Sequence, residues 1–384
     1  MRQILFILII LAGAVLSGCA KTDLVFVEGD SKEIVFDAPV PRVHTKADLV
    51  KDLYPENSTF CVFADQHWDT FLNTETEDFT PYMRGTDEGG EGVEVKHSGV
   101  SMTIGNEVFD HYWKPDRSYM WPKDGYLTFA AYSPAYVRDH AQISYTQEFG
   151  VGIENYTVDA DADNHYDLMF SSRVTDRKKT DMETDLPSPY DGVQIVFEHV
   201  LSAIVFHVQA DRNYAEWGYN VHMTNLSLHN VYSTADFRQF AGKENDEVDM
   251  AGMWTGYEGK REYVAFHADD DDSIMHDQDA DLILLPQSLA EEGMEPVRME
   301  LQFEMSHPDM AGMKTHHSIS FDLSQGKKAD DTVVDRWEPG KRYVYTITIG
   351  LDTIEFSPEV YAWEDHQVPD LPPLDQIPFV TLKD

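Results

Sequence analysis

Short runs of β-branched and aromatic residues, separated by turn residues, are the feature that most constrains the fold of this chain. Residues 126–132 are apolar on both faces, which is typical of a strand inside a layered structure. Residues 343–349 alternate strictly and place tyrosine and isoleucine on one face. Residues 24–27 and 33–36, which are rich in β-branched and aromatic residues, also predict strands. A helical pattern is scarce, and only residues 46–53 suggest a short helix. The sequence therefore predicts an all-β protein.

The longest apolar stretch of the mature chain, residues 193–208, exceeds one ordinary strand and predicts a bulge or kink near Glu198 and His199. The polar residues 173–191 before it show no apolar periodicity and predict a domain boundary. With many turns and no alternating helices, we expect two tandem antiparallel β-sandwich domains. The expected segments are a signal peptide (1–18), a lipidated tether (19–23), an N-terminal β-sandwich (24–185), a C-terminal β-sandwich (190–363) and a proline-rich tail (364–384).

The N-terminal residues have the pattern of a secretory signal. Arg2 supplies a positive charge, and the apolar residues 4–16 form a run that is too short to span a bilayer. Residues 16–19 (LSGC) resemble the lipobox of bacterial lipoproteins, in which the cysteine becomes the acylated N-terminus. This resemblance implies a lipid on Cys19 that anchors the chain in the outer membrane at the cell surface.

Charge and cysteine content argue against nucleic-acid binding and against an intrachain disulfide. The formal net charge is −40, from 69 acidic and 29 basic residues, so the chain lacks the basic surface that nucleic-acid binding requires. Apart from Cys19 the only cysteine is Cys61, so we expect no intrachain disulfide and a buried free thiol at Cys61.

The alternating carboxylates Asp159, Asp161 and Asp163 resemble the start of a calcium loop. The twelfth position is Phe170 rather than a bidentate glutamate, so the match to an EF-hand is poor. These aspartates are weak calcium candidates, and the sequence predicts no other cofactor or metal.

Catalytic signatures are absent from the sequence. It contains no G-x-S-x-G elbow, no H-E-x-x-H motif and no phosphate-binding glycine loop, and Cys61 is the one thiol left as a nucleophile. We therefore expect a protein that is not an enzyme. Aromatic residues in loop-like stretches, such as Trp113, Trp121, Trp217 and Trp254, could stack on sugar rings, but core packing is the favoured interpretation.

Several segments together resemble the fimbrillin superfamily of Bacteroidales, specifically the fimbrillin-like, Mfa-like lipoproteins. Each segment alone is ordinary strand and turn chemistry, and the specificity lies in their order, their spacing and the lipobox. The segments are residues 126–134 (YLTFAAYSP), 166–171 (YDLMFS), 193–199 with 201–208, 284–287 (LLPQ) and 337–343 (WEPGKRY).

The resemblance implies two transthyretin-like β-sandwich domains and a role as a fimbrial subunit, anchor or tip. In stalk members of the family, a trypsin-like protease removes the first strand after an arginine, and a strand of the next subunit fills the vacated groove. Such strand addition satisfies unpaired backbone groups and apolar pockets together. The expected partners are therefore outer-membrane lipid, other fimbrial subunits and a host or bacterial surface ligand.

The sequence departs from the family pattern at the processing site. Where threonine-arginine-alanine is common, this chain has Thr45, Lys46 and Ala47, with Arg42 three residues before Thr45. Arg42 and Lys46 are both processing candidates, and an uncleaved anchor or tip subunit fits as well as a stalk subunit. The alternative of a different class is a monomeric surface lipoprotein that binds a glycan or host ligand through its loops.

Overall fold

The computed structural model of the chain describes residues 33–37, 58–85, 90–97, 102–104, 107–109, 113–179, 192–210, 220–249, 253–267, 282–307, 309, 314–349 and 354–362. Strands dominate these ranges, which confirms the predicted all-β class. Within them, no helix has the length and apolar character needed to cross a membrane. The helical turns are 3-10 helices: η1 (Thr76–Asp78), η2 (Ala135–Asp139), η3 (Ala162–Asn164) and η6 (Leu323–Gln325).

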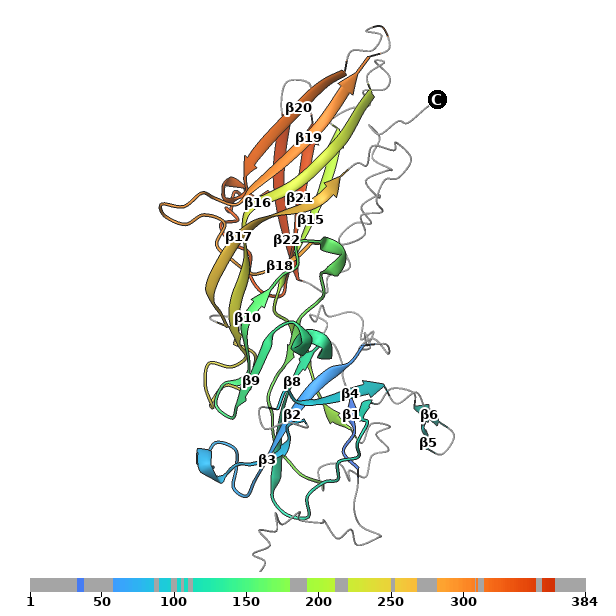
Figure 1. Cartoon of the computed structure of the whole chain (residues 1–384), viewed down its shortest axis with the longest axis vertical. Helices are drawn as coiled ribbons and strands as arrows, with labels where there is room; N and C mark the ends of the chain where they lie inside the picture. The colour runs from blue at the N-terminus through green and yellow to red at the C-terminus, as the bar shows by residue number, and fades with distance from the viewer. Residues whose placement is uncertain are drawn as a thin grey trace, which may run out of the picture.

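One sheet, the ten-stranded sheet, contains the first strand of the described chain (Figure 1). Its order is β13 (Val193–Gln194), β1 (Phe36–Asp37), β7 (Trp113–Pro115), β4 (Val93–His97), β2 (Phe60–His67), β8 (Tyr126–Ser133), β11 (Met169–Ser171) and β14 (Phe197–His199), with β12 (Val174–Arg177) beside β8 and β3 (Thr80–Met83) beside β2.

Two further sheets contain most of the remaining strands. The six-stranded sheet has the order β20 (Lys314–Asp322), β19 (Arg298–Ser306), β16 (Asn220–Arg238), β10 (Gly150–Thr157) and β9 (Gln142–Thr146), with β17 (Trp254–His267) beside β16. The four-stranded sheet has the order β18 (Leu282–Leu284), β15 (Ser202–Ala210), β21 (Lys341–Ile349) and β22 (Ile354–Ala362). A separate hairpin pairs β5 (Met102–Ile104) with β6 (Glu107–Phe109).

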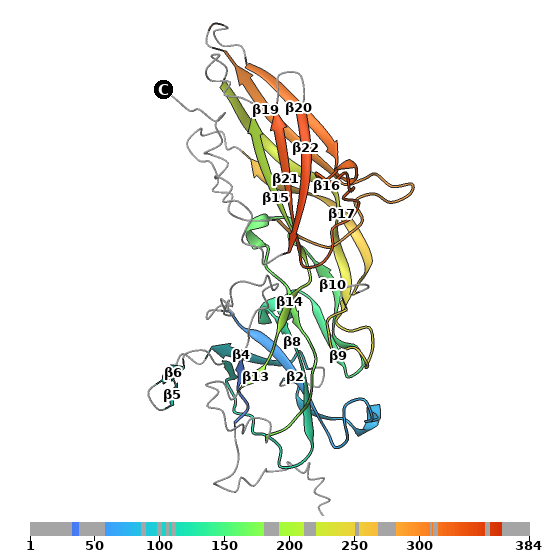
Figure 2. The same cartoon turned by 180° about the vertical axis from the view of Figure 1, so that it is seen from behind.

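The six-stranded sheet runs from one end of the elongated molecule to its middle (Figures 1 and 2). Toward one end it packs on the four-stranded sheet, and toward the middle β9 and β10 lie against the ten-stranded sheet. One continuous apolar core accordingly contains Leu226 and Tyr345 as well as Phe63 and Ile153. Phe63 stacks on Tyr145 of β9 with the ring centroids 4.5 Å apart.

Strand β8 is buried on both faces, as its apolar sequence predicts. Phe129 and Ala131 belong to an inner core of the ten-stranded sheet, together with Phe60 on β2. Tyr132 belongs to the continuous core beneath β9 and β10. The ten-stranded sheet therefore has a separate apolar core on each face.

The predicted kink near His199 is a change of sheet. Strand β14 ends at His199 in the ten-stranded sheet, and β15 begins at Ser202 in the four-stranded sheet. Val200 and Leu201 between them are fully buried. The apolar stretch is long because it supplies two sheets in succession.

Strand pairing crosses the predicted domain boundary in both directions. Strands β9 and β10, which precede it in sequence, pair within the six-stranded sheet, while β13 and β14, which follow it, pair within the ten-stranded sheet. Among the strands of the described ranges, two ladders are parallel, β15 with β21 and β1 with β13, and the other ladders are antiparallel. The division into units of 24–185 and 190–363 stays a prediction.

Candidate functional site

The segment at residues 33–37 is inserted between β13 and β7 of the ten-stranded sheet. Phe36 lies opposite Val193 in a parallel ladder and opposite Trp113 in an antiparallel ladder. Glu33 forms an isolated bridge with Met120. The predicted strand over residues 33–36 is thus confirmed in part, as one isolated bridge at Glu33 and the two-residue strand β1.

Main-chain hydrogen bonds hold this segment on both sides. The bonds are Ile34 N–H to the Tyr119 carbonyl (2.7 Å), Val193 N–H to the Val35 carbonyl (2.8 Å) and Ile195 N–H to the Asp37 carbonyl (2.8 Å). Because side chains alternate along a strand, every second side chain of this segment can point into the core.

Two side chains of the segment fill the inner core of the ten-stranded sheet. Ile34 and Phe36 are both 0% exposed, while Val35 lies half-buried between them. The Phe36 ring meets Phe60 and Phe129 edge-on, with ring centroids 6.1 and 5.8 Å apart. Burying such side chains contributes about 1.5–3 kcal/mol each. The segment therefore supplies part of the core as well as a strand.

Gly192 allows the segment to approach β13 closely. A Cβ atom at this position would lie 2.9 Å from both the Asp37 nitrogen and the Phe36 carbonyl carbon. Both atoms belong to the main chain, so they could give way only if the strand itself moved. Glycine inside a sheet often marks such close approach of another backbone.

Several predicted sites lie outside the described residues. They are the lipidation site Cys19, the processing candidates Arg42 and Lys46, and the first expected strand at residues 24–27. The segment at 33–37 ends five residues before Arg42 in sequence.

Cys61 is a free, fully buried thiol on β2, as predicted. Burial raises the pKa of the thiol to about 11, although Arg138 Nη1 lies 3.4 Å from Sγ and opposes that rise. Cys61 is therefore neutral at physiological pH and a poor nucleophile.

A buried ion pair lies on β2, near the six-stranded sheet. Asp65 is 1% exposed, pairs with Arg84, and accepts a hydrogen bond of 3.2 Å from the Tyr145 hydroxyl on β9. Burial raises the pKa of Asp65 above its ordinary value, and Arg84 opposes this rise. The hydrogen bond from Tyr145 ties the two sheets together by a polar contact.

The predicted calcium candidates form a turn around η3. The Asp159 carboxylate accepts the Asp161 N–H at 2.8 Å, and the Asp161 carboxylate accepts the Asp163 N–H at 3.1 Å. The first of these bonds lowers the pKa of Asp159. Across the described ranges, no group of three or more His, Cys, Asp or Glu residues is arranged to hold a metal ion. The hydrogen bonds account for the alternating pattern, and calcium binding stays a prediction.

The tryptophans that could have stacked on sugars are core residues. Trp113, Trp121 and Trp254 are 1%, 5% and 7% exposed, as the core-packing interpretation predicts. Trp217 lies outside the described residues.

A family model described as fimbrillin-like matches residues 72–363 of the chain. The match includes β8, the sheet change after β14, and the six- and four-stranded sheets. No curated protein matches the chain.

Two solved structures that are similar to this chain come from Bacteroides species. A fimbrial protein from Bacteroides vulgatus is 16% identical, with 87% of this chain and 100% of that chain covered and a TM-score of 0.56. A candidate cell adhesion protein from Bacteroides uniformis is also 16% identical, with 86% and 98% covered and a TM-score of 0.45. The first of these similarities establishes the shared fold.

Proposed function

Because the chain belongs to the fimbrillin-like family, we propose that it is a non-enzymatic component of a cell-surface fimbria, and that it joins other subunits when a strand of a neighbouring subunit replaces its N-terminal segment. The observation that carries this proposal is the segment at residues 33–37. It is bonded on both sides by main-chain hydrogen bonds, and it buries Ile34 and Phe36 completely.

Removing this segment would create an acceptor site for another strand. The edges of β13 and β7 would lose their pairing, and the inner core would lose the Ile34 and Phe36 side chains. Unpaired edges beside apolar pockets favour the addition of a matching strand. A strand from a second subunit would pair with both edges and would fill the apolar pockets at the same time.

Proteolysis provides the step that makes exchange favourable. While the chain is intact, the segment is tethered and its effective concentration at the groove is high. A cut at Arg42 or Lys46 would leave the segment held by non-covalent contacts alone. A neighbouring subunit could then compete for the groove.

We attribute membrane attachment to a lipid on Cys19. With this anchor and no cut at Arg42 or Lys46, the subunit would occupy the base or the tip of a fimbria instead of the stalk. Replacing Cys19 with alanine should move the protein from the outer-membrane fraction to the soluble fraction, as measured by fractionation and immunoblot. If the Cys19→Ala protein stayed in the membrane fraction, a lipid on Cys19 would not be the membrane anchor.

Limited proteolysis tests the exchange mechanism. The chain from residue 20 to 384, treated with an arginine-specific protease, should release its N-terminal peptide and form oligomers whose masses are multiples of one subunit. Light scattering after size-exclusion chromatography measures this. The matched control is the double variant Arg42→Gln with Lys46→Gln, which should stay monomeric. A cut chain that remains monomeric at high concentration would contradict strand exchange.

A further inference from the structure

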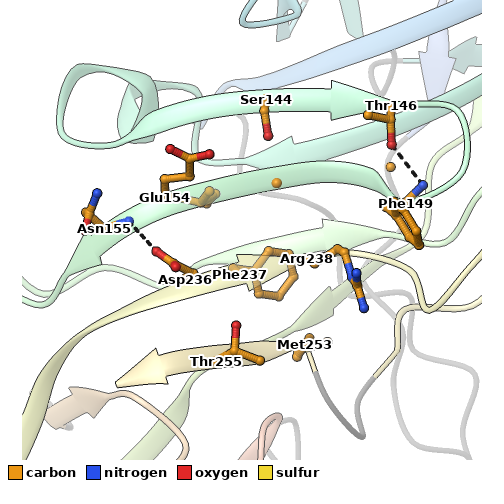
Figure 3. Close-up of a pocket in the computed structure, with 13 residues that line it drawn as sticks. Ser144, Thr146, Phe149, Glu154, Asn155, Asp236, Phe237, Arg238, Met253 and Thr255 are labelled. Atoms are coloured by element: carbon orange, nitrogen blue, oxygen red, sulfur yellow. Dashed lines mark hydrogen bonds between the residues drawn. The ribbon is translucent and has the colours of Figure 1, made fainter. Parts of the chain in front are cut away.

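A groove with both polar and apolar lining residues lies on the six-stranded sheet, far in sequence from the N-terminal segment (Figure 3). Its volume is about 430 Å³, which falls in the range of small-molecule sites, about 300–1,000 Å³. Strands β9, β10, β16 and β17 contribute its lining. We call it the β10 groove and define it by Ser144, Gly150, Gly152, Glu154, Asp236 and Arg238.

The groove is hollow beside Gly152, where β10 carries no side chain. Gly150 does not add to this hollow, because a Cβ atom there would lie 2.5 Å from the Gln239 Oε1 and from the Phe240 ring. Gly152 lies opposite Ser144 on β9 and opposite Arg238 on β16, so no β10 side chain separates these two residues. Gly150 has a φ of +66°, a conformation that by itself favours glycine.

Gly152 has no such conformational reason to be glycine. A Cβ atom there would lie 2.6 Å from the Ser144 Oγ, and its next nearest neighbour would be 3.6 Å away. Ser144 is exposed, so its hydroxyl can rotate aside. Glycine weakens a strand interior and often marks a position where a ligand comes close to the backbone. Gly152 keeps the groove open at some cost to the strand.

The charged groups around the groove are of both signs. Glu154 and Asp236 are exposed carboxylates, and Arg238 is an exposed guanidinium. The Arg238 Cζ atom lies 4.4 Å from the centre of the Phe149 ring, which supports the guanidinium by stacking. Within the described chain, neither Glu154 nor Arg238 has a side-chain hydrogen bond or ion pair. Both retain their full capacity to bind a ligand.

This mixture of groups selects among ligand classes. A small cation would lie near Arg238, and a small anion would lie near the two carboxylates, so neither is well matched. An added peptide strand would need free main-chain groups, but β10 is paired with β9 on one side and with β16 on the other. A neutral polyhydroxylated ligand donates to carboxylates and accepts from a guanidinium at the same time.

We propose that the β10 groove binds a neutral oligosaccharide. Glu154 and Asp236 accept hydrogen bonds from sugar hydroxyls, Arg238 donates to them, and Gly152 lets a sugar ring approach the strand. This site lies on a sheet face instead of in loops, and it does not depend on fimbrial assembly.

Ligand-observed NMR tests the proposal with four neutral probes: maltotriose, cellotriose, mannotriose and triacetylchitotriose. The chain from residue 20 to 384 should give saturation transfer to at least one probe, with a Kd of about 1 mM or tighter. Gly152→Val should weaken that binding at least about tenfold, because its side chain fills the groove. Arg238→Gln, an exposed substitution that leaves the core intact, should weaken it to a similar degree.

Gly242→Val is the matched control, because a Cβ atom at Gly242 would meet nothing within 4 Å and the residue does not line the groove. It should bind like the unmodified chain. The proposal is overturned if none of the four probes binds. It is equally overturned if binding survives both Gly152→Val and Arg238→Gln, or if citrate or spermidine occupies the groove in preference to all four sugars. Oligomerisation after proteolysis is a separate readout, so either proposal can fail without the other.

Discussion

Phe36 makes the largest single contribution of the N-terminal segment to the core, since its ring is fully buried between Phe60 and Phe129. Phe36→Ala should lower the free energy of unfolding by about 3 kcal/mol, within the range for buried phenylalanine. Urea unfolding followed by circular dichroism measures this. Val35→Ala, at the half-buried neighbouring position, should cost about 1 kcal/mol. Equal effects of the two substitutions would mean that the segment does not fill the core.

Cys61 should be almost unreactive in the folded chain. Burial raises its pKa from 9.0 to about 11, so the thiolate population at pH 8 falls about a hundredfold. Because the folded-state pKa is raised, the stabilising contribution of the thiol is complete below pH 9.0 and is lost as the pH rises through about 11.

The corresponding measurement is alkylation by iodoacetamide at pH 8, using the chain from residue 20 so that Cys19 is absent. The native chain should react at least about a hundredfold more slowly than the chain in urea. Similar rates in the two states would show that Cys61 is accessible.

At the residue scale, the sequence identified the core side chains better than it identified the glycines. Ile34 and Phe36 belong to a recognisable strand pattern, and Cys61 lies in an apolar run. Gly192 and Gly152 carry no such signal, because their importance comes from atoms of distant strands. A glycine in a strand-like stretch suggests a close approach, but it does not say which backbone or ligand approaches.

Arg173 links elements that are far apart in the sequence. Its guanidinium donates to the Lys243 carbonyl at 2.7 Å and to the Glu148 carbonyl at 2.8 Å, and it stacks 4.1 Å from the Phe240 ring centre. Burial lowers the pKa of Arg173 to about 10, so the group stays protonated at neutral pH.

Arg173→Met should therefore lower the free energy of unfolding by about 3 kcal/mol, since the two carbonyls lose their donor. Chemical unfolding at pH 7 measures this loss. The control is Arg298→Met, which removes an exposed pair with Glu295 and should cost less than about 1 kcal/mol. A loss for Arg173→Met that is no larger than the control would mean that the link is not structurally important.

At the element scale, apolar strands were predictable and polar ones were not. The apolar patterns of residues 126–132 and 343–349 predicted buried strands, and these residues form β8 and β21. Strands β9, β10 and β17 are rich in polar residues and glycine on their exposed positions, so no sequence pattern separated them from loops. Strands β10 and β17 pair with opposite edges of β16, which has 19 residues, and β9 pairs in turn with β10.

At the scale of the whole molecule, the all-β class and the family resemblance were accessible from the sequence, but the connections among sheets were not. Strands β9 and β10 join a sheet built mostly from later residues, and β13 and β14 join a sheet built mostly from earlier ones. Such pairings depend on complementarity between distant segments, which a single sequence does not display. The candidate site was predictable as an N-terminal strand, whereas its neighbours β13 and β7 were not.

Peptide replacement tests the exchangeable strand most directly. A fluorescent peptide with residues 30–40 (DSKEIVFDAP followed by valine) is titrated into the chain from residue 43 to 384 and into the chain from residue 20 to 384, and binding is followed by fluorescence anisotropy. The peptide should bind the shorter chain and not the longer one, and a peptide carrying Phe36→Ala should bind at least about tenfold more weakly. Equal binding to both chains, or no binding to a folded shorter chain, would contradict the account.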